Sequence, residues 1–292
     1  MKKKLGMVII NYNDAPTTKK LLTNIKSYKC IDKIVVVDNH STDNSLDELK
    51  AFESNHITII KNSKNNGYAS GLNTGAKYLI KELGDCNIIF SNSDIIIKGE
   101  KDLKLLSSNI KDNVGVVGPV IFEHGNYNRG WKLTSTNTEI LLNLPLISRY
   151  FKKKLLYYKD EHYKKDISYV DVVSGCFFLV DSKLLEEIDY FDENTFLYYE
   201  ELIFSKKVQN INKKLCIDNR IEIIHDHSVT IDKNVKKINK YKILKSSQRY
   251  YVEEYLNPNL IQKALLYITN KLSLVIMYIR CIFRRVKWKE LF

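Results

Sequence analysis

The stretch IVVVDNHSTD, residues 34–43, joins an apolar, β-branched run to a run of polar, turn-forming side chains. The first half predicts a short strand buried on both faces, and the second half begins where that strand ends. The same arrangement recurs when the apolar runs 5–10 and 87–90 are followed by Asn11-Tyr12-Asn13 and by Ser91-Asn92-Ser93-Asp94. Since parallel α/β sheets bind ligands at the carboxyl ends of their strands, these repeats predict a binding site.

Helical patterns separate these strands. We expect strands at residues 5–10, 33–37, 57–61 and 87–90, with helices at 17–28, 44–52 and 70–82. This order predicts an α/β fold with a doubly wound, Rossmann-like parallel sheet. From residue 99 to 166 the pattern loosens, which predicts a variable loop or lid that handles a second substrate. Regular structure is expected again at 170–180, with helices at 182–188 and 200–210 and a strand at 221–225.

The net charge of +12 is concentrated at the carboxyl end of the chain. Residues 233–292 hold 14 Lys and Arg against 3 Asp and Glu, so residues 1–232 carry a net charge of only +1. We therefore expect a catalytic domain over 1–232 and a basic, amphipathic helical tail over 233–292 that meets an anionic surface. The tail alternates bases with aliphatic residues and offers no stacking platform, which disfavours nucleic acid as the partner.

In the tail, Lys263, Lys271 and Arg280 interrupt an apolar segment, so its longest uncharged run is shorter than a spanning helix needs. Residues 260–292 are therefore predicted to lie in the interface of an anionic membrane. The alternative is a helix packed on the catalytic domain or at a homodimer contact. Five scattered cysteines without metal-ligand spacing indicate a reducing compartment, and we expect a cytoplasmic protein on the inner face of the cell membrane.

Two motifs near the first strands suit a nucleotide. Asp38 could accept a hydrogen bond from the ring N–H of a uracil or thymine, and Asn39 and Ser41 could serve the turn and the next helix cap. The alternative for this run is a strand-end turn with helix capping only. Glycines at 67, 71 and 75 lead into a helix and could bring backbone close to a phosphate. The alternative for these glycines is tight packing of that helix on the sheet.

Two further motifs suit catalysis. Asp94 is placed where a divalent cation could be held against a diphosphate, and His225 or His227 could add a ligand, although such a pair at a strand end is often structural. Glu200 and Glu201 follow an aromatic run, where a carboxylate could have the raised pKa of a general base. The alternative for this pair is compensation of the helix dipole.

Taken in order, these segments resemble the family 2 glycosyltransferases, particularly their rhamnosyltransferase-like branch. The residues that carry the resemblance span roughly 5–230 and include 8–13, 35–43, 66–75, 92–94, 174–180, 191–201 and 225–228. The resemblance implies a GT-A fold, a nucleoside-diphosphate sugar donor, Mg²⁺ or Mn²⁺, and single displacement with inversion.

Carried over position by position, the resemblance also assigns residues. Nucleoside and donor binding is implied for the strand-end and glycine-motif residues Asn11, Asn13, Asp38, Asn39, Asn66, Gly67, Gly71, Asn73 and Asn92. Metal binding is implied for Asp94 and His225, and Glu201 is the expected base with Glu200 beside it.

The sequence departs from the family at two points. Asn92 stands where the metal motif usually has its first acid, and Glu200-Glu201 stands where the base motif is Glu-Asp. The expected acceptor is a hydroxyl of a growing, lipid-linked bacterial surface glycan, and the expected donor is dTDP-rhamnose or a UDP-hexose. Two alternatives stay open, a non-catalytic scaffold with this fold and a nucleotidyltransferase. The latter usually has a Gly-rich, basic phosphate signature in its first loop, which residues 11–18 lack.

Overall fold

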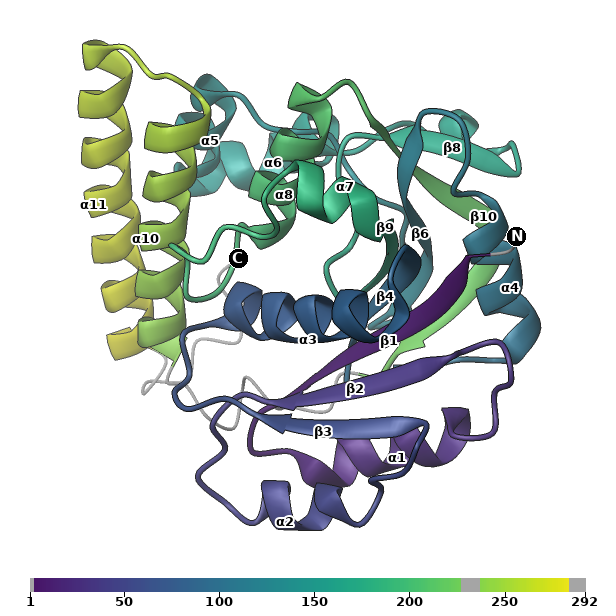
Figure 1. Cartoon of the computed structure of the whole chain (residues 1–292). Coiled ribbons are helices and arrows are strands. Elements are labelled where there is room, and N and C mark those ends of the chain that lie inside the picture. The colour runs from purple at the N-terminus through teal and green to yellow at the C-terminus, as the bar shows by residue number, and fades with distance from the viewer. Residues whose placement is uncertain (1–2, 227–236, 284–292) are drawn as a thin grey trace.

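The computed structural model describes residues 3–226 and 237–283. A mixed sheet of ten strands runs through the molecule in the order β3-β2-β1-β4-β9-β6-β10-β5, with β7 on β6 and β8 on β10 (Figure 1). The strands are β1 Lys4–Asn11, β2 Lys33–Asp38, β3 Ile57–Lys61, β4 Cys86–Asn92, β5 Ile95–Ile96, β6 Val114–Glu123, β7 Asn126–Asn128, β8 Ile167–Val170, β9 Phe177–Asp181 and β10 Lys214–His225. The helices are α1 Ala15–Ile25, α2 Ser45–Lys50, α3 Tyr68–Leu83, α4 Glu100–Ser108, α5 Thr136–Leu142, α6 Pro145–Leu156, η1 Asp160–Tyr163, α7 Ser182–Glu187, α8 Glu200–Asn210, α10 Lys237–Tyr255 and α11 Leu260–Phe283.

The first half of the chain forms the predicted Rossmann-like unit. Strands β1 to β4 are mutually parallel, and β1 lies between β2 and β4. Helices α1, α2 and α3 connect them at the predicted places, and Pro16 in the first turn helps to begin α1. The expectation of an α/β fold with a doubly wound nucleotide-binding sheet is therefore confirmed.

The second half corrects two expectations. The sheet is mixed rather than parallel, because β9 lies antiparallel between β4 and β6, and β5 is antiparallel to β10. Residues 99–166, expected to be a loose loop or lid, contain α4, the ten-residue strand β6, β7, α5 and α6. Strand β6 is buried on both faces over Gly115–Ile121, but Gly115, Gly118 and Pro119 interrupt its apolar run, and these residue types usually indicate turns rather than a strand.

Each face of the sheet is covered by helices. One core packs α1, α2 and α4 against one set of strand side chains, and the other packs α3, α7 and α8 against the opposite set. In Figure 1, α3 crosses in front of β1 while α1 and α2 lie behind and below the sheet. Alternate residues of β1 enter opposite cores, as Ile9 and Val8 illustrate.

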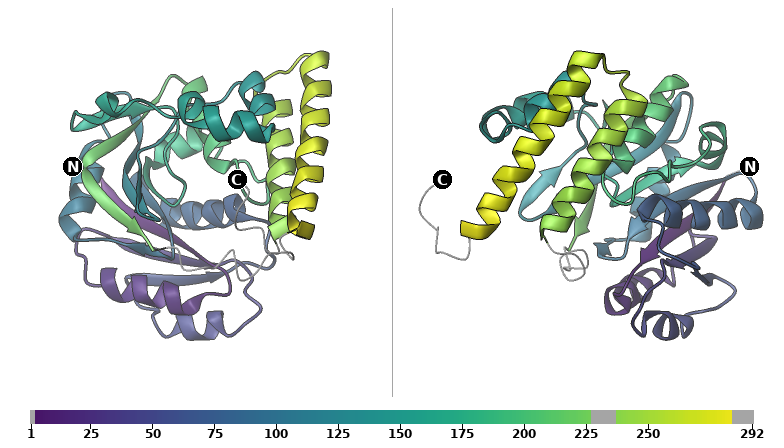
Figure 2. Two further views of the ribbon diagram at one scale, coloured as in Figure 1. Left: turned by 180° about the vertical axis from the view of Figure 1, so that it is seen from behind. Right: turned by 90° about the vertical axis from the view of Figure 1, so that its left-hand side faces the viewer.

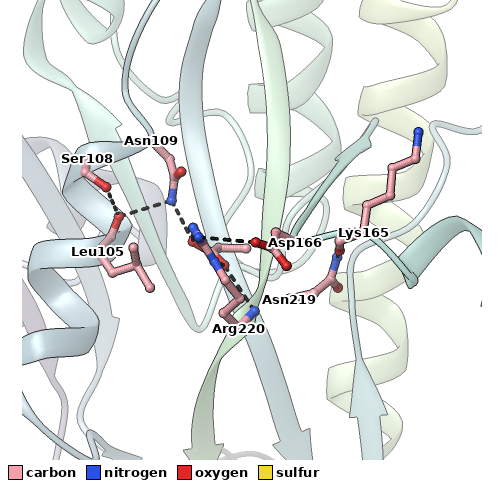
Figure 3. A network of polar contacts seen from close by, with 8 residues as sticks. Leu105, Ser108, Asn109, Lys165, Asp166, Asn219 and Arg220 are labelled. Carbon is pink, nitrogen blue, oxygen red and sulfur yellow. Dashed lines mark hydrogen bonds and ion pairs between the residues drawn. The ribbon is translucent and has the colours of Figure 1, made fainter.

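A polar network supports an irregularity in the long strand β10. The register between β10 and β6 shifts between Asp218 and Glu222, so backbone groups there leave the regular ladder. The fully buried Asp218 receives two side-chain hydrogen bonds from Arg220, at 2.9 and 2.7 Å, and one of 2.7 Å from Asn109. Figure 3 shows Arg220 reaching between Asn109 and Asp166. This network lets β10 continue past the shift to His225 at the far end of the strand.

The carboxyl-terminal helices α10 and α11 form a hairpin at one side of the molecule (Figure 2). Tyr251 and Val252 of α10 and Leu266 of α11 share a third core with Ile140 of α5 and Ile203 of α8. This part of the predicted tail is therefore packed on the preceding helices, which was the alternative interpretation.

The segment Leu260–Arg280 has a mean hydropathy of 1.3 and is, by length and composition alone, able to cross a membrane. The sequence prediction differs, because it counts only the uncharged run between Lys271 and Arg280. In the structure one face of this helix packs on α5 and α10. The bases beyond residue 283 lie outside the described residues.

Candidate active site

The sheet brings the predicted residues to one edge. Because β1, β2, β4, β6 and β10 all point the same way, their last residues lie along a single edge of the sheet. These residues are Asn11, Asp38, Asn92, Glu123 and His225. The antiparallel β9 begins at the same edge, just after Cys176, whose carbonyl accepts a 2.8 Å hydrogen bond from the Asn92 backbone N–H.

The ends of β1 and β2 are joined by a buried hydrogen-bond cluster. Asn11 Nδ2 donates to Asp38 Oδ1 at 2.9 Å, and Thr18 Oγ1 donates to Asn11 Oδ1 at 2.8 Å. The other oxygen of Asp38 accepts from the Ser41 backbone N–H at 3.0 Å. Both side chains are fully buried, so their polar atoms are engaged inside the protein and hold the two strand-end loops together.

Two asparagines near this cluster extend it. Asn13 is in the left-handed backbone region with φ 52°, and its Oδ1 accepts from the Thr42 N–H at 2.7 Å. Asn39 donates to Asn65 and to the Gly67 carbonyl, at 3.1 and 3.0 Å, so it ties β2 to the loop before α3. Asn66, in that loop, is exposed.

The glycine motif at the start of α3 has a packing explanation. A Cβ on Gly75 would lie 2.4 Å from Val8, and one on Gly71 would lie 3.1 Å from Ile10, so both positions let the helix lie close on β1. Gly67 has φ 104°, and a Cβ there would lie 2.4 Å from the Phe196 carbonyl oxygen. Asn73 does not face a free space, because its amide exchanges hydrogen bonds with the backbone of Phe191. The motif therefore fastens α3 both to the sheet and to the loop that precedes α8.

Asp94 and His225 meet at the centre of the edge. Asp94 Oδ1 lies 3.1 Å from His225 Nε2, and His225 Nδ1 lies 3.1 Å from Glu123 Oε2. Burial opposes a charged ring, but the carboxylates of Asp94 and Glu123 raise the pKa of His225 to about 12. His227 lies outside the described residues.

This arrangement suits a divalent cation that would take the place of the proton on His225 Nε2. Asp94 Oδ1 is buried and has no hydrogen-bond partner besides this ion pair in the described part of the chain. A carboxylate oxygen and an imidazole nitrogen thus face each other, and the second ring nitrogen is held by a carboxylate, as is common for metal-binding histidines. Among residues 3–226 and 237–283, no three His, Cys, Asp or Glu side chains are grouped to hold a metal by themselves.

Tyr68 connects this centre to the carboxylates of α8. Its hydroxyl donates to Asn92 Oδ1 at 2.7 Å and lies 3.2 Å from the Gly175 carbonyl. Burial, with the nearby Cys176, Glu200, Glu201 and Asp94, raises the pKa of Tyr68 well above its usual value.

Glu200 and Glu201 begin α8 and are in an environment that disfavours charge. Burial, together with the neighbouring Glu201, raises the pKa of Glu200 to about 8, and burial also raises the pKa of Glu201. Glu200 Oε1 has no hydrogen-bond partner in the described part of the chain. Glu201 is half-buried and lies directly against Gly175, where a Cβ would be 3.0 Å from Glu201 Oε1. Glu201 therefore lies beside Gly175, whose carbonyl is 3.2 Å from the Tyr68 hydroxyl.

The loop before these carboxylates has an unusual backbone. Asp189, Tyr190, Tyr198 and Tyr199 all have φ between 52° and 73°, in the left-handed region. For residues other than glycine such conformations are costly, and they persist where the surroundings enforce them.

Contacts from α10 enforce the conformation of this loop. Tyr250 and Tyr255 donate to Asp192 Oδ2 at 2.8 and 2.5 Å, and Ser247 donates to the Leu197 carbonyl at 2.8 Å. The position of Glu200 and Glu201 thus depends on a helix that lies beyond residue 232.

A buried carboxylate, Glu139 of α5, forms a second link. It accepts hydrogen bonds from Thr134, Tyr199 and Gln248 at 2.5, 2.6 and 2.6 Å. It therefore joins the first turn of α8 to α10.

Sequence reasoning missed several of these residues. Glu123 ends a strand that was expected to be a loop, Tyr68 lies in the 66–75 motif but received no role of its own, and Glu139 belongs to no motif. The alignment of strand ends that reveals Glu123 depends on β6 and β10 being parallel neighbours, which no local pattern shows.

With this geometry described, the chain can be compared with known proteins. The profile of "Glycosyl transferase family 2" matches residues 7–189, more than half of the chain. The chain belongs to glycosyltransferase family 2. It is 27% identical over 228 residues to the low-salt glycan biosynthesis hexosyltransferase Agl10 of Haloferax volcanii, a match that covers 77% of this chain and 68% of the relative. This match supports the family and leaves the rhamnosyltransferase-like branch without support.

Solved structures agree on the fold. The mannosyltransferase PcManGT from Pyrobaculum calidifontis, in complex with GDP-Man and Mn²⁺, superposes with a TM-score of 0.59 at 13% identity, over 99% of this chain and 77% of that one. GalNAc-T7 with UDP, GalNAc and Mn²⁺ superposes with a TM-score of 0.60 at 14% identity, over 92% of this chain and 54% of that one. The family 2 glycosyltransferase therefore has the GT-A fold that its sequence indicated.

Proposed function

We propose that this glycosyltransferase transfers a hexose from a nucleoside-diphosphate donor, dTDP-rhamnose or a UDP-hexose, to a hydroxyl of an acceptor glycan, with inversion. The observation that carries the proposal is the meeting of the Asp94–His225 pair and the Glu200–Glu201 pair at one sheet edge, linked through Tyr68 and Asn92. One pair suits a diphosphate-bound cation and the other suits removal of a proton from a hydroxyl.

The donor would lie along the strand ends. We propose that Asn13, Asn39 and Asn66 face the nucleoside and sugar, while Asn11 and Asp38, which are fully buried, support their loops from beneath. Gly67, Gly71 and Asn73 would shape the donor site indirectly, because they fix the position of α3.

Asp94 and His225 would hold Mg²⁺ or Mn²⁺, and diphosphate oxygens and water would complete its coordination. When bound, the cation would neutralise the charge that develops on the leaving diphosphate. The neighbour structures that contain Mn²⁺ support this choice.

Glu201 is the proposed base. Its half-buried carboxylate lies at the strand edge against Gly175, and its raised pKa matches the needs of a group that must take a proton near neutral pH. Glu200, whose pKa is raised to about 8, would stay protonated beside it below that pH, so that any negative charge of the pair is on Glu201. As the acceptor hydroxyl loses its proton to Glu201, its oxygen would bond to the anomeric carbon from the face opposite the diphosphate, and the bond from that carbon to the diphosphate oxygen would break, which inverts the sugar carbon.

The acceptor and location follow from the tail. We propose a lipid-linked surface glycan as the acceptor and a cytoplasmic protein attached to the inner face of the membrane through residues 260–292. The exposed apolar and basic side chains of α11 support this proposal. The functional division into 1–232 and 233–292 remains a proposal, as does a homodimer.

A donor-hydrolysis screen tests the function. The purified chain would be incubated with Mn²⁺ or Mg²⁺ and a panel of UDP-, dTDP- and GDP-sugars, with released nucleoside diphosphate as the signal. We expect one donor to react and a chelator to abolish the signal. Silence across the panel without nucleotide binding would refute a transferase and leave the scaffold, whereas release of pyrophosphate from a nucleoside triphosphate would favour a nucleotidyltransferase.

Variants test the roles. Asp94→Ala should abolish metal-dependent turnover, and Glu201→Gln should lower turnover while the donor Kd stays unchanged. If only Glu200→Gln lowers turnover, Glu200 is the base instead.

A further inference from the structure

Helix α6 (Pro145–Leu156) has no buried residue. Its exposed apolar side chains include Leu146 and Tyr150, each 69% exposed, and Phe151, 52% exposed. A helix of this length gains little stability by itself in water, so exposed apolar groups on it suggest a surface that is covered in use.

Helix α11 has its polarity reversed relative to a helix of a water-soluble protein. Its polar residues Thr269, Asn270 and Ser273 are buried against the protein. The side chains it exposes at spacings of three and four are Ile261, Leu265, Ile268, Leu272, Val275 and Ile279. Spacings of three and four place these residues on one stripe along the helix, directed away from the protein.

The two helices are held together through α5. Asn143, which caps the carboxyl end of α5, donates to Thr269 at 3.0 Å, and Gln262 of α11 donates to Asn137 of α5 at 2.9 Å. In both views of Figure 2 the teal α5 and α6 lie next to the yellow α11. Helices α6 and α11 both contact α5, so their exposed side chains lie on neighbouring parts of the surface.

The charged residues of α6 and α11 themselves are all basic. Residues 140–159 and 255–289 contain no Asp or Glu, whereas α6 carries Arg149 and Lys152–Lys154 and α11 carries Lys263, Lys271 and Arg280. Aromatic rings accompany the bases, because the Arg149 guanidinium lies 5.7 Å from the Tyr150 ring and Lys271 Nζ lies 5.4 Å from the Tyr267 ring. Bases mixed with exposed aromatic and aliphatic groups suit the interface of an anionic bilayer.

We propose that α6 is a second membrane-contact element, which rests with the exposed stripe of α11 on the surface of an anionic lipid bilayer. The inference deepens the membrane association proposed above and adds a segment that lies far from the basic tail in sequence. A second copy of the chain fits this surface less well, since the charged residues of α6 and α11 are all basic and two copies of these helices would repel each other.

Vesicle binding by the full-length chain tests the proposal. Vesicles of phosphatidylcholine, with and without about one third phosphatidylglycerol, would be sedimented with the unmodified chain and with a Lys152→Glu, Lys153→Glu, Lys154→Glu variant. We expect binding to the anionic vesicles to weaken by about tenfold or more in the variant. A Tyr150→Ser, Phe151→Ser variant should also weaken binding, although its charge is unchanged.

A matched control carries the same charge reversal at Lys29, Lys81 and Lys111, which are exposed on other elements. It should bind the anionic vesicles like the unmodified chain. The proposal is overturned if the unmodified chain does not bind anionic vesicles, if both α6 variants bind as it does, or if the control loses as much affinity. A dimer in sedimentation analysis that the α6 variants convert to monomer would also overturn it in favour of a second copy. Donor hydrolysis with a soluble donor, measured on every variant, shows whether the fold is intact and reports separately on the proposed function.

Discussion

Gly175 offers a direct test of where Glu201 acts. A Cβ added at this position would lie 2.8 Å from Glu201 Cγ and 3.0 Å from Glu201 Oε1. Gly175 is not among the glycines with positive φ, so alanine is compatible with its backbone. The methyl group of Gly175→Ala must therefore be accommodated by the Glu201 side chain, which has to withdraw by about half an ångström to reach an ordinary contact.

The expected effects on stability and on catalysis differ. A side chain forced off its rotamer costs about 1 kcal/mol, and replacing glycine by alanine recovers a similar amount through the unfolded chain, so the free energy of unfolding should change little. Turnover is more sensitive, because misplacing a catalytic group by about 1 Å can cost about a hundredfold. We expect kcat for donor hydrolysis to fall by about ten- to a hundredfold, or about 1.4–2.7 kcal/mol in the barrier, with the donor Kd unchanged.

Two further proteins make this measurement decisive. Gly99→Ala is the control, since its Cβ would meet only Lys101, at 4.0 Å. If Gly175→Ala acts through Glu201, adding it to Glu201→Gln should cause little additional loss. A folded Gly175→Ala protein with the kcat of the unmodified chain would refute the placement of the base, as would full additivity with Glu201→Gln.

Three other results are expected. Because burial raises the pKa of Glu200 to about 8, its contribution to stability is fully present below its ordinary pKa of 4.5 and is lost as pH rises through about 8, so Tm should fall over this range and Glu200→Gln should flatten the slope. Glu123→Gln should lower the affinity for Mn²⁺ by about ten- to a hundredfold in calorimetry, since Glu123 orients His225; unchanged affinity would show that the contact is incidental. Gln248→Leu should lower the free energy of unfolding by about 1–3 kcal/mol in denaturant titrations, because Glu139 loses a buried donor, and a change under a few tenths would contradict this role.

The parts of the fold that could be predicted from sequence have local signals. Strand β2 is a short β-branched run with a polar turn after it, and the helices of the first half have clear apolar spacing. Strand β6 is also a continuous buried run, but Gly115, Gly118 and Pro119 interrupt it, and glycine and proline usually indicate turns or breaks rather than a central strand. The antiparallel placement of β9 between β4 and β6 is set by pairing between distant segments, which a local pattern does not encode.

The residues of the candidate site also fall into those that the sequence predicts and those that it does not. Asp94 and His225 could be predicted as neighbours because Asp94 follows β4 and His225 ends β10, and the carboxyl ends of parallel strands share an edge. Glu123 could have been found by the same rule if β6 had been recognised. Gly71 and Gly75 were correctly predicted to let the backbone of α3 come close to another group. That group is β1 rather than a phosphate. A sequence shows that a glycine is needed and leaves open which neighbour requires it.

The chain becomes strongly basic after residue 232, but residues beyond that point still hold the candidate active site in place. The strained loop of residues 189–199 explains why. Its four left-handed residues cost about 1–3 kcal/mol each, and the compensating contacts come from elsewhere in the chain. Asn73 of α3 contributes hydrogen bonds to Phe191, and Tyr250 and Tyr255 of α10 bind Asp192. Local preferences alone would relax this loop and move the start of α8. The conformation that presents Glu200 and Glu201 therefore requires α10 in place, so the helix that opens the basic tail also holds the carboxylates that the proposed reaction uses.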